Sequence, residues 1–258
     1  MRAYFRLIRP INCFMVAVAV AIGALVAIGP EGLSLHYSAV GLACCVAFLS
    51  TGAGNALNDY FDRDIDRINH PSRPIPAGQI GPDTALLLSF ILFLSSLVVA
   101  SFINILVIII VGANLVVMVS YEIFSKAKGL AGNLTISWLT GTTFLFGGAA
   151  VLAVENTMVL AALAFLATLG REIAKDIEDV EGDVGRLTVP MQVGTTNASI
   201  MASTAIFSSV LLSPLPAMLG LFSGSGWILF ILLIAAADAM FIYCIFLLAK
   251  GKPSASNA

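Results

Sequence analysis

The stretch NALNDYFDRDIDRINHPSRPIPAG, residues 55–78, is the most polar segment of a very apolar chain. On a helix, Asn58, Asp62 and Asp66 would share one face, because they are spaced four residues apart, and Asp59 would lie beside them. Carboxylates packed this closely repel one another, so a positive group must offset them. Mg²⁺ is the natural candidate, since it commonly joins one or two carboxylates to a substrate phosphate.

A second acidic stretch, REIAKDIEDVEGDVGRLTVP, occupies residues 171–190. Its residues Asp176, Asp179 and Asp183 have the same spacing as Asp59, Asp62 and Asp66, and each lies 117 residues further along the chain. Ten of the fifteen acidic residues fall in these two stretches, which is more than solvated helix ends would explain. We therefore predict one domain, residues 1–258, with two repeated halves of about 1–130 and 131–258. Two acidic clusters with basic neighbours indicate a diphosphate site clamped by metal ions.

The composition is that of a membrane protein. Apolar residues make up 59% and charged residues 11% of the chain, and the mean hydropathy is +0.99. Soluble domains are nearer half apolar and a quarter charged. Basic residues are few and interspersed with acids, so no nucleic-acid partner is expected. The four cysteines lie in apolar runs without metal-ligand spacing and are expected to be packing residues.

A membrane-spanning helix needs about 20 apolar residues. The sequence contains eight such runs, so we predict an all-α bundle of eight transmembrane helices. Pro214 and Pro216 predict a kink in the seventh span, and Ser101 to Asn104 a tight turn between the third and fourth. The predicted spans are 11–29, 36–57, 82–101, 103–121, 132–154, 157–176, 198–221 and 227–249.

All thirteen Lys and Arg residues fall on one side of this topology. Positive charge is enriched in cytoplasmic loops. Both termini and both acidic stretches should therefore face the cytoplasm. Asp238 lies within the last span, where an ionisable group is costly, so it is either functional or a hydrogen-bonded link between helices.

The two acidic stretches resemble the motifs of the UbiA superfamily of intramembrane prenyltransferases. Residues 58–66 match NDxxDxxxD, and Asp176, Asp179 and Asp183 match DxxDxxxD. Arg9 to Asn12 resembles the family's N-terminal RPxN, and the segment from Tyr121 to Lys126, followed by Gly132-Asn133, resembles its basic loop. The family has nine helices where eight are read here. The ninth is either absent or formed by a break of span seven at Pro214, and the charge pattern favours its absence.

The resemblance implies transfer of a prenyl group from its diphosphate, with Mg²⁺ as cofactor and membrane lipid as the surroundings. It implies that Asp62, Asp66, Asp179 and Asp183 are catalytic. These four would bind metal together with Asn58, Asp59 and Asp176. The candidates for substrate binding are Arg9, Asn12, Arg67, Arg73, Tyr121, Lys126, Lys128 and Arg186.

Within the family, the wording KDIEDVEGD (residues 175–183) is most similar to the archaeal lipid branch. That branch transfers geranylgeranyl from geranylgeranyl diphosphate to the hydroxyl of geranylgeranylglyceryl phosphate, and a carboxylate of the second motif is the expected base. The alternative within the family is an aromatic acceptor such as 4-hydroxybenzoate. A secondary transporter is the alternative of another class, but the carboxylates cluster at one membrane face and the halves are parallel.

Overall fold

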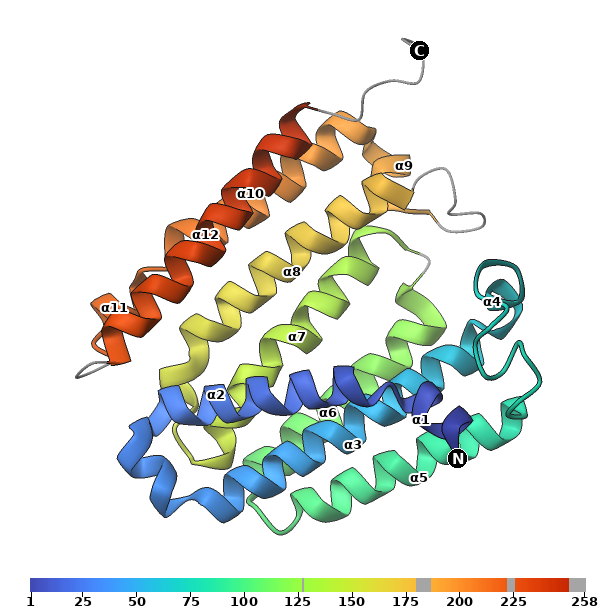
Figure 1. The fold of residues 1–258 in the computed structure, drawn as a ribbon, viewed down its shortest axis with the longest axis horizontal. Helices are drawn as coiled ribbons and strands as arrows, with labels where there is room; N and C mark the ends of the chain where they lie inside the picture. Colours follow the sequence, from blue (N-terminus) through green and yellow to red (C-terminus); the bar gives the residue numbers. More distant parts are fainter. Residues whose placement is uncertain (127, 180–186, 222–225, 251–258) are drawn as a thin grey trace. The chain divides into compact units, whose positions relative to one another are not determined.

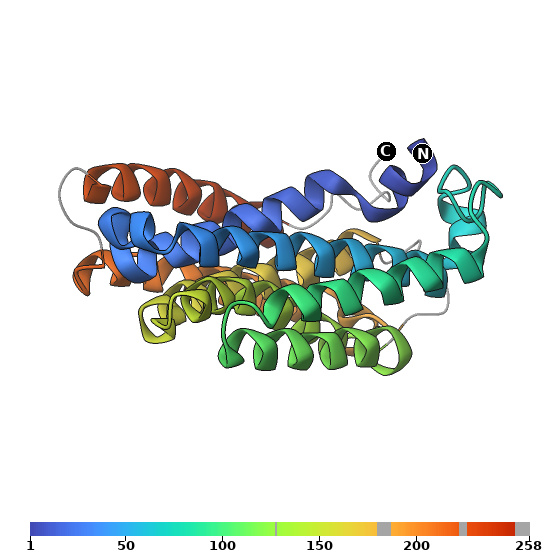
Figure 2. The ribbon, with the colours of Figure 1, turned by 90° about the horizontal axis from the view of Figure 1, so that it is seen from below.

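The computed structural model describes residues 1–126, 128–179, 187–221 and 226–250, and every regular element in these ranges is helical (Figures 1 and 2). The chain divides into two compact units. Unit 1 comprises Met1–Glu122 and Thr143–Thr157, and unit 2 comprises Ile123–Thr142 and Met158–Ala258.

Unit 1 is built around α3, which packs against α2 on one side and α5 on the other (Figure 1). Its core is formed mainly by alanines and valines of α2, α3, α5, α6 and the end of α7, including Ala43, Val46 and Val107, together with Phe146. Its helices are α1 (Arg2–Ile8), α2 (Pro10–Leu35), α3 (Tyr37–Phe61), α4 (Arg63–Asn69), α5 (Pro82–Ala100), α6 (Ile105–Ser120) and η2 (Val154–Thr157). The π-helix η1 (Tyr121–Ser125) begins here, and α7 (Leu130–Ala150) ends here.

Local sequence explains where these helices start and stop. Pro10 and Pro82 occupy first-turn positions, where the missing N–H costs no hydrogen bond. Gly29 has φ +71 and ψ 174, so the regular part of α2 stops there, as the predicted span 11–29 requires. Asn104 caps α6 by accepting a hydrogen bond from the Val107 N–H at 3.0 Å, and it ends the predicted tight turn after α5.

Unit 2 packs α10 against α8, with α12 against α10. Ile173, Val189, Ala198 and Ala202 form its buried cluster. The helices are α8 (Met158–Asp179), α9 (Val189–Val193), α10 (Thr195–Leu212), α11 (Leu215–Met218) and α12 (Gly226–Lys250). The long apolar side chains that α12 exposes suit contact with lipid, because a helix satisfies its own backbone hydrogen bonds.

All eight predicted spans coincide with helices. Seven described helices are long and apolar enough to cross a membrane: Pro10–Leu35, Tyr37–Phe61, Pro82–Ala100, Ile105–Ser125, Val154–Asp179, Thr195–Met218 and Phe230–Lys250. The eighth, α7, has 21 residues but mixes threonines, glycines and Asn133 with its apolar side chains, which lowers its hydropathy. The chain is a multi-pass membrane protein.

The seventh span breaks where the prolines predict. The α-helix α10 ends at Leu212, and after Ser213 and Pro214 only the single turn α11 follows. A four-residue helix is too short to cross a membrane, so this span is not two membrane helices. At the break, the Ser213 hydroxyl lies 2.6 Å from an oxygen of Asp238. Asp238 therefore links α10 and α12 at the point where α10 loses its regular hydrogen bonds.

Candidate active site

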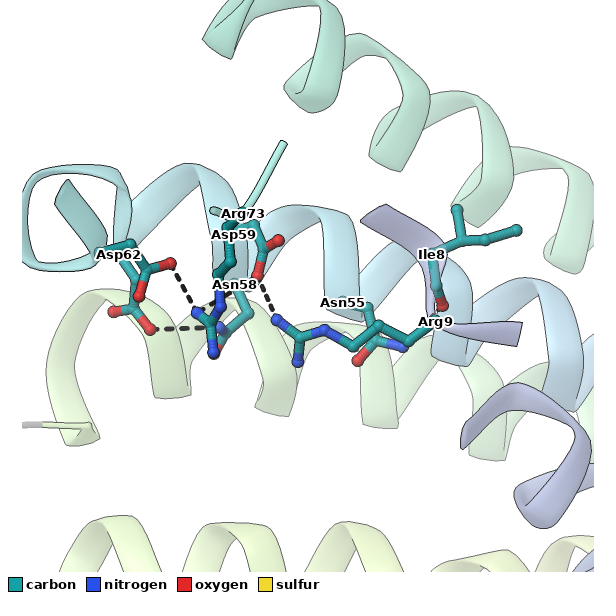
Figure 3. Close-up of polar contacts among 8 residues, drawn as sticks. Ile8, Arg9, Asn55, Asn58, Asp59, Asp62 and Arg73 are labelled. Carbon is teal, nitrogen blue, oxygen red and sulfur yellow. Dashed lines mark hydrogen bonds and ion pairs between the residues drawn. The ribbon is translucent and has the colours of Figure 1, made fainter. Parts of the chain in front are cut away.

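Asp59, at the polar end of α3, is the most deeply buried carboxylate of the first acidic stretch, with 1% of its surface exposed. One of its oxygens, Oδ1, accepts a hydrogen bond from the Arg9 guanidinium and lies 3.6 Å from Nη1 of Arg73 (Figure 3). The same Arg73 nitrogen donates to Oδ2 of Asp66 at 2.5 Å. Two buried carboxylates thus face two guanidinium groups, and the four charges cancel.

This cancellation is what allows the carboxylates to be buried. Removing a charge from water costs several kcal/mol, and only a well-placed partner of opposite sign offsets that cost. These ion pairs also affect the prediction that Asp59 and Asp66 bind a metal ion. Asp59 and Asp66 are both engaged by arginine, and we infer that the arginines are their counter-ions in this arrangement.

Arg9 reaches Asp59 because the chain turns sharply between α1 and α2. Its backbone has φ 51 and ψ 69, a left-handed conformation that residues with a side chain rarely adopt. The flanks hold it there: Asn55 of α3 donates to the Ile8 carbonyl at 2.8 Å, and Leu7 is fully buried against Ala56 and the loop after α4. We did not predict Asn55 as a contact residue. The available signal was an amide inside an otherwise apolar span.

Asn58 and Asp62 form a second pair in the same cluster, with the Asn58 amide donating to Oδ2 of Asp62 at 3.1 Å (Figure 3). On a single helix Asn58, Asp62 and Asp66 would share one face, but α3 ends at Phe61 and α4 starts at Arg63. Backbone bonds still join Asp62 to Asn58 and Asp66 to Asp62 across the break. Asp62 therefore sits at the corner, while Asp66 lies on α4 and shares Arg73 with Asp59.

The side chains of two predicted substrate residues of unit 1 are exposed and make no contact with this cluster that the structure describes. The exposed Arg67 pairs with the exposed Asp64 at 3.3 Å, one turn away on α4. Asn12 is exposed in the first turn of α2, where its backbone N–H donates to the Arg9 carbonyl at 3.0 Å. Of the predicted residues, the structure brings together Arg9, Asn58, Asp59, Asp62, Asp66 and Arg73.

The second acidic motif belongs to unit 2. Asp176 lies on α8 and accepts a hydrogen bond from the amide of Asn133 at 2.8 Å. Asp179 is exposed and is the last residue of the helix. The other two predicted residues of this region, Asp183 and Arg186, lie outside the described residues.

The predicted basic loop links η1 to α7. Tyr121 and Lys126 are half-buried, whereas Lys128 is exposed and its backbone N–H donates to the Ser125 carbonyl at 3.0 Å. A π-helix such as η1 is rare and is often found at functional positions. The loop therefore offers two ammonium groups next to an irregular helix end.

The donor set fits Mg²⁺ bound together with phosphate better than a preformed metal cage. Within the described ranges, no three His, Cys, Asp or Glu side chains gather closely enough to hold an ion. Asn58 and Asp62 nevertheless lie side by side, and each carries a side-chain oxygen of the kind that Mg²⁺ binds. Mg²⁺ usually keeps several waters and takes only one or two carboxylates in addition to phosphate oxygens.

The fold and this polar cluster define a multi-pass helical membrane protein with arginine-paired and amide-paired carboxylates at the end of a long helix. Residues 14–258 match the UbiA prenyltransferase family. The chain belongs to this family.

Curated relatives cover nearly the whole chain. A protein of Natronomonas pharaonis named digeranylgeranylglyceryl phosphate synthase is 44% identical over 239 residues, which is 91% of this chain and 83% of the relative. A protein of the same name from Methanothermobacter thermautotrophicus is 38% identical over 258 residues, 99% of this chain and 88% of the relative.

Solved structures agree on the fold. A structure described as giving insights into digeranylgeranylglyceryl phosphate synthase in membranes has a TM-score of 0.81 and 38% identity, and the match covers 96% of this chain and 87% of the other. A UbiA homolog from Archaeoglobus fulgidus, solved with GPP and Mg²⁺, has a TM-score of 0.73 at 20% identity, with 95% and 86% covered.

Proposed function

We propose that this protein transfers a geranylgeranyl group from geranylgeranyl diphosphate to the free hydroxyl of geranylgeranylglyceryl phosphate, with Mg²⁺ as cofactor. The product carries the second ether bond of an archaeal membrane lipid. The observation that carries the proposal is 38–44% identity to relatives named for this synthase, over 91–99% of the chain. The Mg²⁺ and GPP in the Archaeoglobus homolog support the cofactor and the class of donor.

In this reaction, the bond between the allylic carbon and the diphosphate oxygen breaks, and both electrons leave with the diphosphate. The acceptor oxygen then bonds to the same carbon and loses its proton. Negative charge grows on the leaving group, so positive groups around it lower the barrier. When bound, Mg²⁺ would supply part of that positive charge.

We propose that each acidic motif supplies the oxygen ligands of one Mg²⁺ ion. Asn58, Asp62 and Asp66 would hold one ion, which requires Asp66 to exchange its contact with Arg73 for the metal, and Asp179 and Asp183 would hold the other. Asp59 is better explained as the counter-ion of Arg9 and Arg73, since both guanidinium groups approach its Oδ1. We propose that a carboxylate of the second motif accepts the proton of the acceptor hydroxyl.

Basic side chains would bind the diphosphate and the phosphate of the acceptor. The candidates are Arg67, Arg73, Lys126 and Lys128, with Arg9 and Arg186 in addition. An arginine can donate two parallel hydrogen bonds to a phosphate, whereas a lysine acts as a point charge. The apolar helices would hold the isoprenoid chain and keep water from the reactive carbon.

The test is an assay of purified protein with Mg²⁺, geranylgeranyl diphosphate and geranylgeranylglyceryl phosphate, with the product identified by mass. We expect a diether phosphate that disappears with EDTA and in Asp62→Ala, while the exposed variant Asp83→Asn keeps wild-type turnover. A prenylated ring from 4-hydroxybenzoate instead would overturn the acceptor. Saturable uptake into proteoliposomes without any prenylated product would favour a transporter.

A further inference from the structure

Asn133, in the first turn of α7, is buried with 8% of its surface exposed. Three of its polar groups have partners within unit 2. The backbone N–H donates to the Gly129 carbonyl at 3.2 Å, and the backbone carbonyl accepts from the Ser137 hydroxyl at 2.6 Å. The side-chain amide donates to Oδ2 of Asp176 on α8 at 2.8 Å. One residue thus connects the basic loop, the start of α7 and the second acidic motif.

The backbone at Gly129 shows why this connection is well defined. Its φ is +54, a conformation that favours glycine, and an added Cβ would lie 2.7 Å from the Leu187 carbonyl oxygen and 2.6 Å from the Gln192 amide nitrogen. The side-chain amide of Gln192 in turn donates a hydrogen bond to the same Leu187 carbonyl oxygen at 3.1 Å. The chain that carries Lys128 into α7 is therefore packed against the segment around Leu187.

The chemistry of the contact matters as much as its position. Asp59 faces guanidinium groups, whose charge offsets its own. The amide of Asn133 is neutral, so it can orient the Asp176 carboxylate without adding a positive charge to it. Carboxylates that bind metals are commonly oriented by such a hydrogen bond from a neighbouring residue.

We propose that Asn133 is a positioning residue that orients Asp176 of the second acidic motif and fixes it relative to the loop of Lys126 and Lys128. The Asp176 carboxylate would then be held in a fixed position to bind a divalent cation, and the ammonium groups of Lys126 and Lys128 would be held to bind the phosphate group that accompanies it. This inference rests on the proposed function, because it treats Asp176 as part of the reaction site.

The experiment is a double-mutant cycle on the full-length protein in detergent, with Asn133→Ala, Asp176→Ala and the double variant. Two quantities are measured: turnover, and the affinity for inorganic diphosphate in the presence of Mg²⁺ by calorimetry. Partners that orient metal ligands typically matter by about 10- to 100-fold, so we expect Asn133→Ala to lose roughly tenfold in kcat and in affinity. In the Asp176→Ala background it should cause no further loss, because its partner is already absent.

Two further variants separate positioning from simple stabilisation. Asn133→Gln keeps an amide donor and should recover part of the loss. Asn197→Ala is the matched control, since Asn197 is an exposed amide on α10 of the same unit, and it donates to the carbonyl of Val193, the last residue of α9, at 2.9 Å. It should stay within about twofold of wild type, as expected for a surface substitution. Thermal unfolding is recorded for every variant, and Asn133→Ser replaces Asn133→Ala if that variant is unfolded at the assay temperature.

Losses that multiply in the double variant would overturn the inference, because Asn133 would then act independently of Asp176. Recovery by Asn133→Gln together with non-additive losses would support it. The outcome for the proposed function is separate. If wild-type protein binds diphosphate and shows the coupling but forms no ether product, the proposed function fails and the positioning role of Asn133 stands.

Discussion

Asp59, at the residue scale, shows how a buried charge reveals its role through its partners. The sequence places it among possible metal ligands, since it belongs to an acidic motif. In the structure, Arg9 and Arg73 both approach its Oδ1 (Figure 3). The position of Arg9 in a left-handed conformation indicates that this contact is held by the surrounding packing, because such a backbone costs of order 1–3 kcal/mol.

We predict that Asp59→Asn destabilises the protein strongly. Asparagine cannot offset the charge of Arg9, whereas Arg73 keeps Asp66 and both guanidinium groups are partly exposed, so the free energy of unfolding should fall by about 1–3 kcal/mol. Asp64→Asn is the matched control, because Asp64 is 69% exposed and its pair with Arg67 should contribute about 0–1 kcal/mol. Denaturant titration of both purified variants measures the difference. Equal effects would show that Asp59 does not act as a buried counter-ion.

Close approach of two helices, at the element scale, depends on glycine in unit 1. An added Cβ at Gly147 of α7 would lie 2.2 Å from the Val20 carbonyl oxygen of α2, and one at Gly23 would lie 2.6 Å from the Phe144 carbonyl oxygen. Two backbones approach this closely only where the residue at the contact is a glycine, which has no side chain. A glycine at this position could serve helix packing or make room for an isoprenoid tail. The contacts indicate helix packing.

We expect Gly147→Ala to push α2 and α7 apart and to lower stability by about 1–3 kcal/mol, the usual cost of overfilling a packed site. Gly112→Ala on α6 is the control, because no atom lies within 4 Å of its added Cβ. Alanine should leave stability unchanged there or raise it slightly, since it favours the helix. The measurement is the midpoint of thermal unfolding in detergent. A Gly147→Ala variant as stable as Gly112→Ala would contradict the packing role.

The break between α3 and α4 is a second point at the element scale. Spacing places Asn58, Asp62 and Asp66 on one face of any helix that contains all three, and in the structure α3 ends at Phe61. Asp62 occupies the corner with φ −81 and ψ 0, outside the regular helix. Periodicity cannot locate such a corner, because the backbone hydrogen bonds of Asp62 and Asp66 continue the helical pattern across it.

The whole molecule raises the question of orientation in the membrane. The positive-inside rule predicts that the loop after α4 faces the cytoplasm and that the loop around Glu31 faces outward. We expect Glu31→Cys, in a protein without its four native cysteines, to react with a membrane-impermeant maleimide in intact cells. Ser72→Cys should react only after the cells are opened, and both positions are exposed in the structure. Labelling of Ser72→Cys in intact cells would show that the loop after α4 faces outward, opposite to the prediction.

The architecture was largely predictable from composition and spacing. A bilayer admits few structures other than helices, and the length of each apolar run sets the length of each helix, so all eight predicted spans appear as helices. The family was likewise readable from the motifs of residues 58–66 and 176–183. The minor departure is α7, whose threonines and glycines make it less apolar than its neighbours.

What the sequence alone determined is the class of fold and the family, because these follow from local patterns, and it supplied the candidate site residues. What only the tertiary structure decided is which charge meets which partner. Arg9 meets Asp59 across 50 residues of sequence, and Asn133 meets Asp176 across 43. Such contacts arise from the packing of separate helices. No periodicity within one helix encodes whether a carboxylate is neutralised by arginine or oriented by a neutral amide.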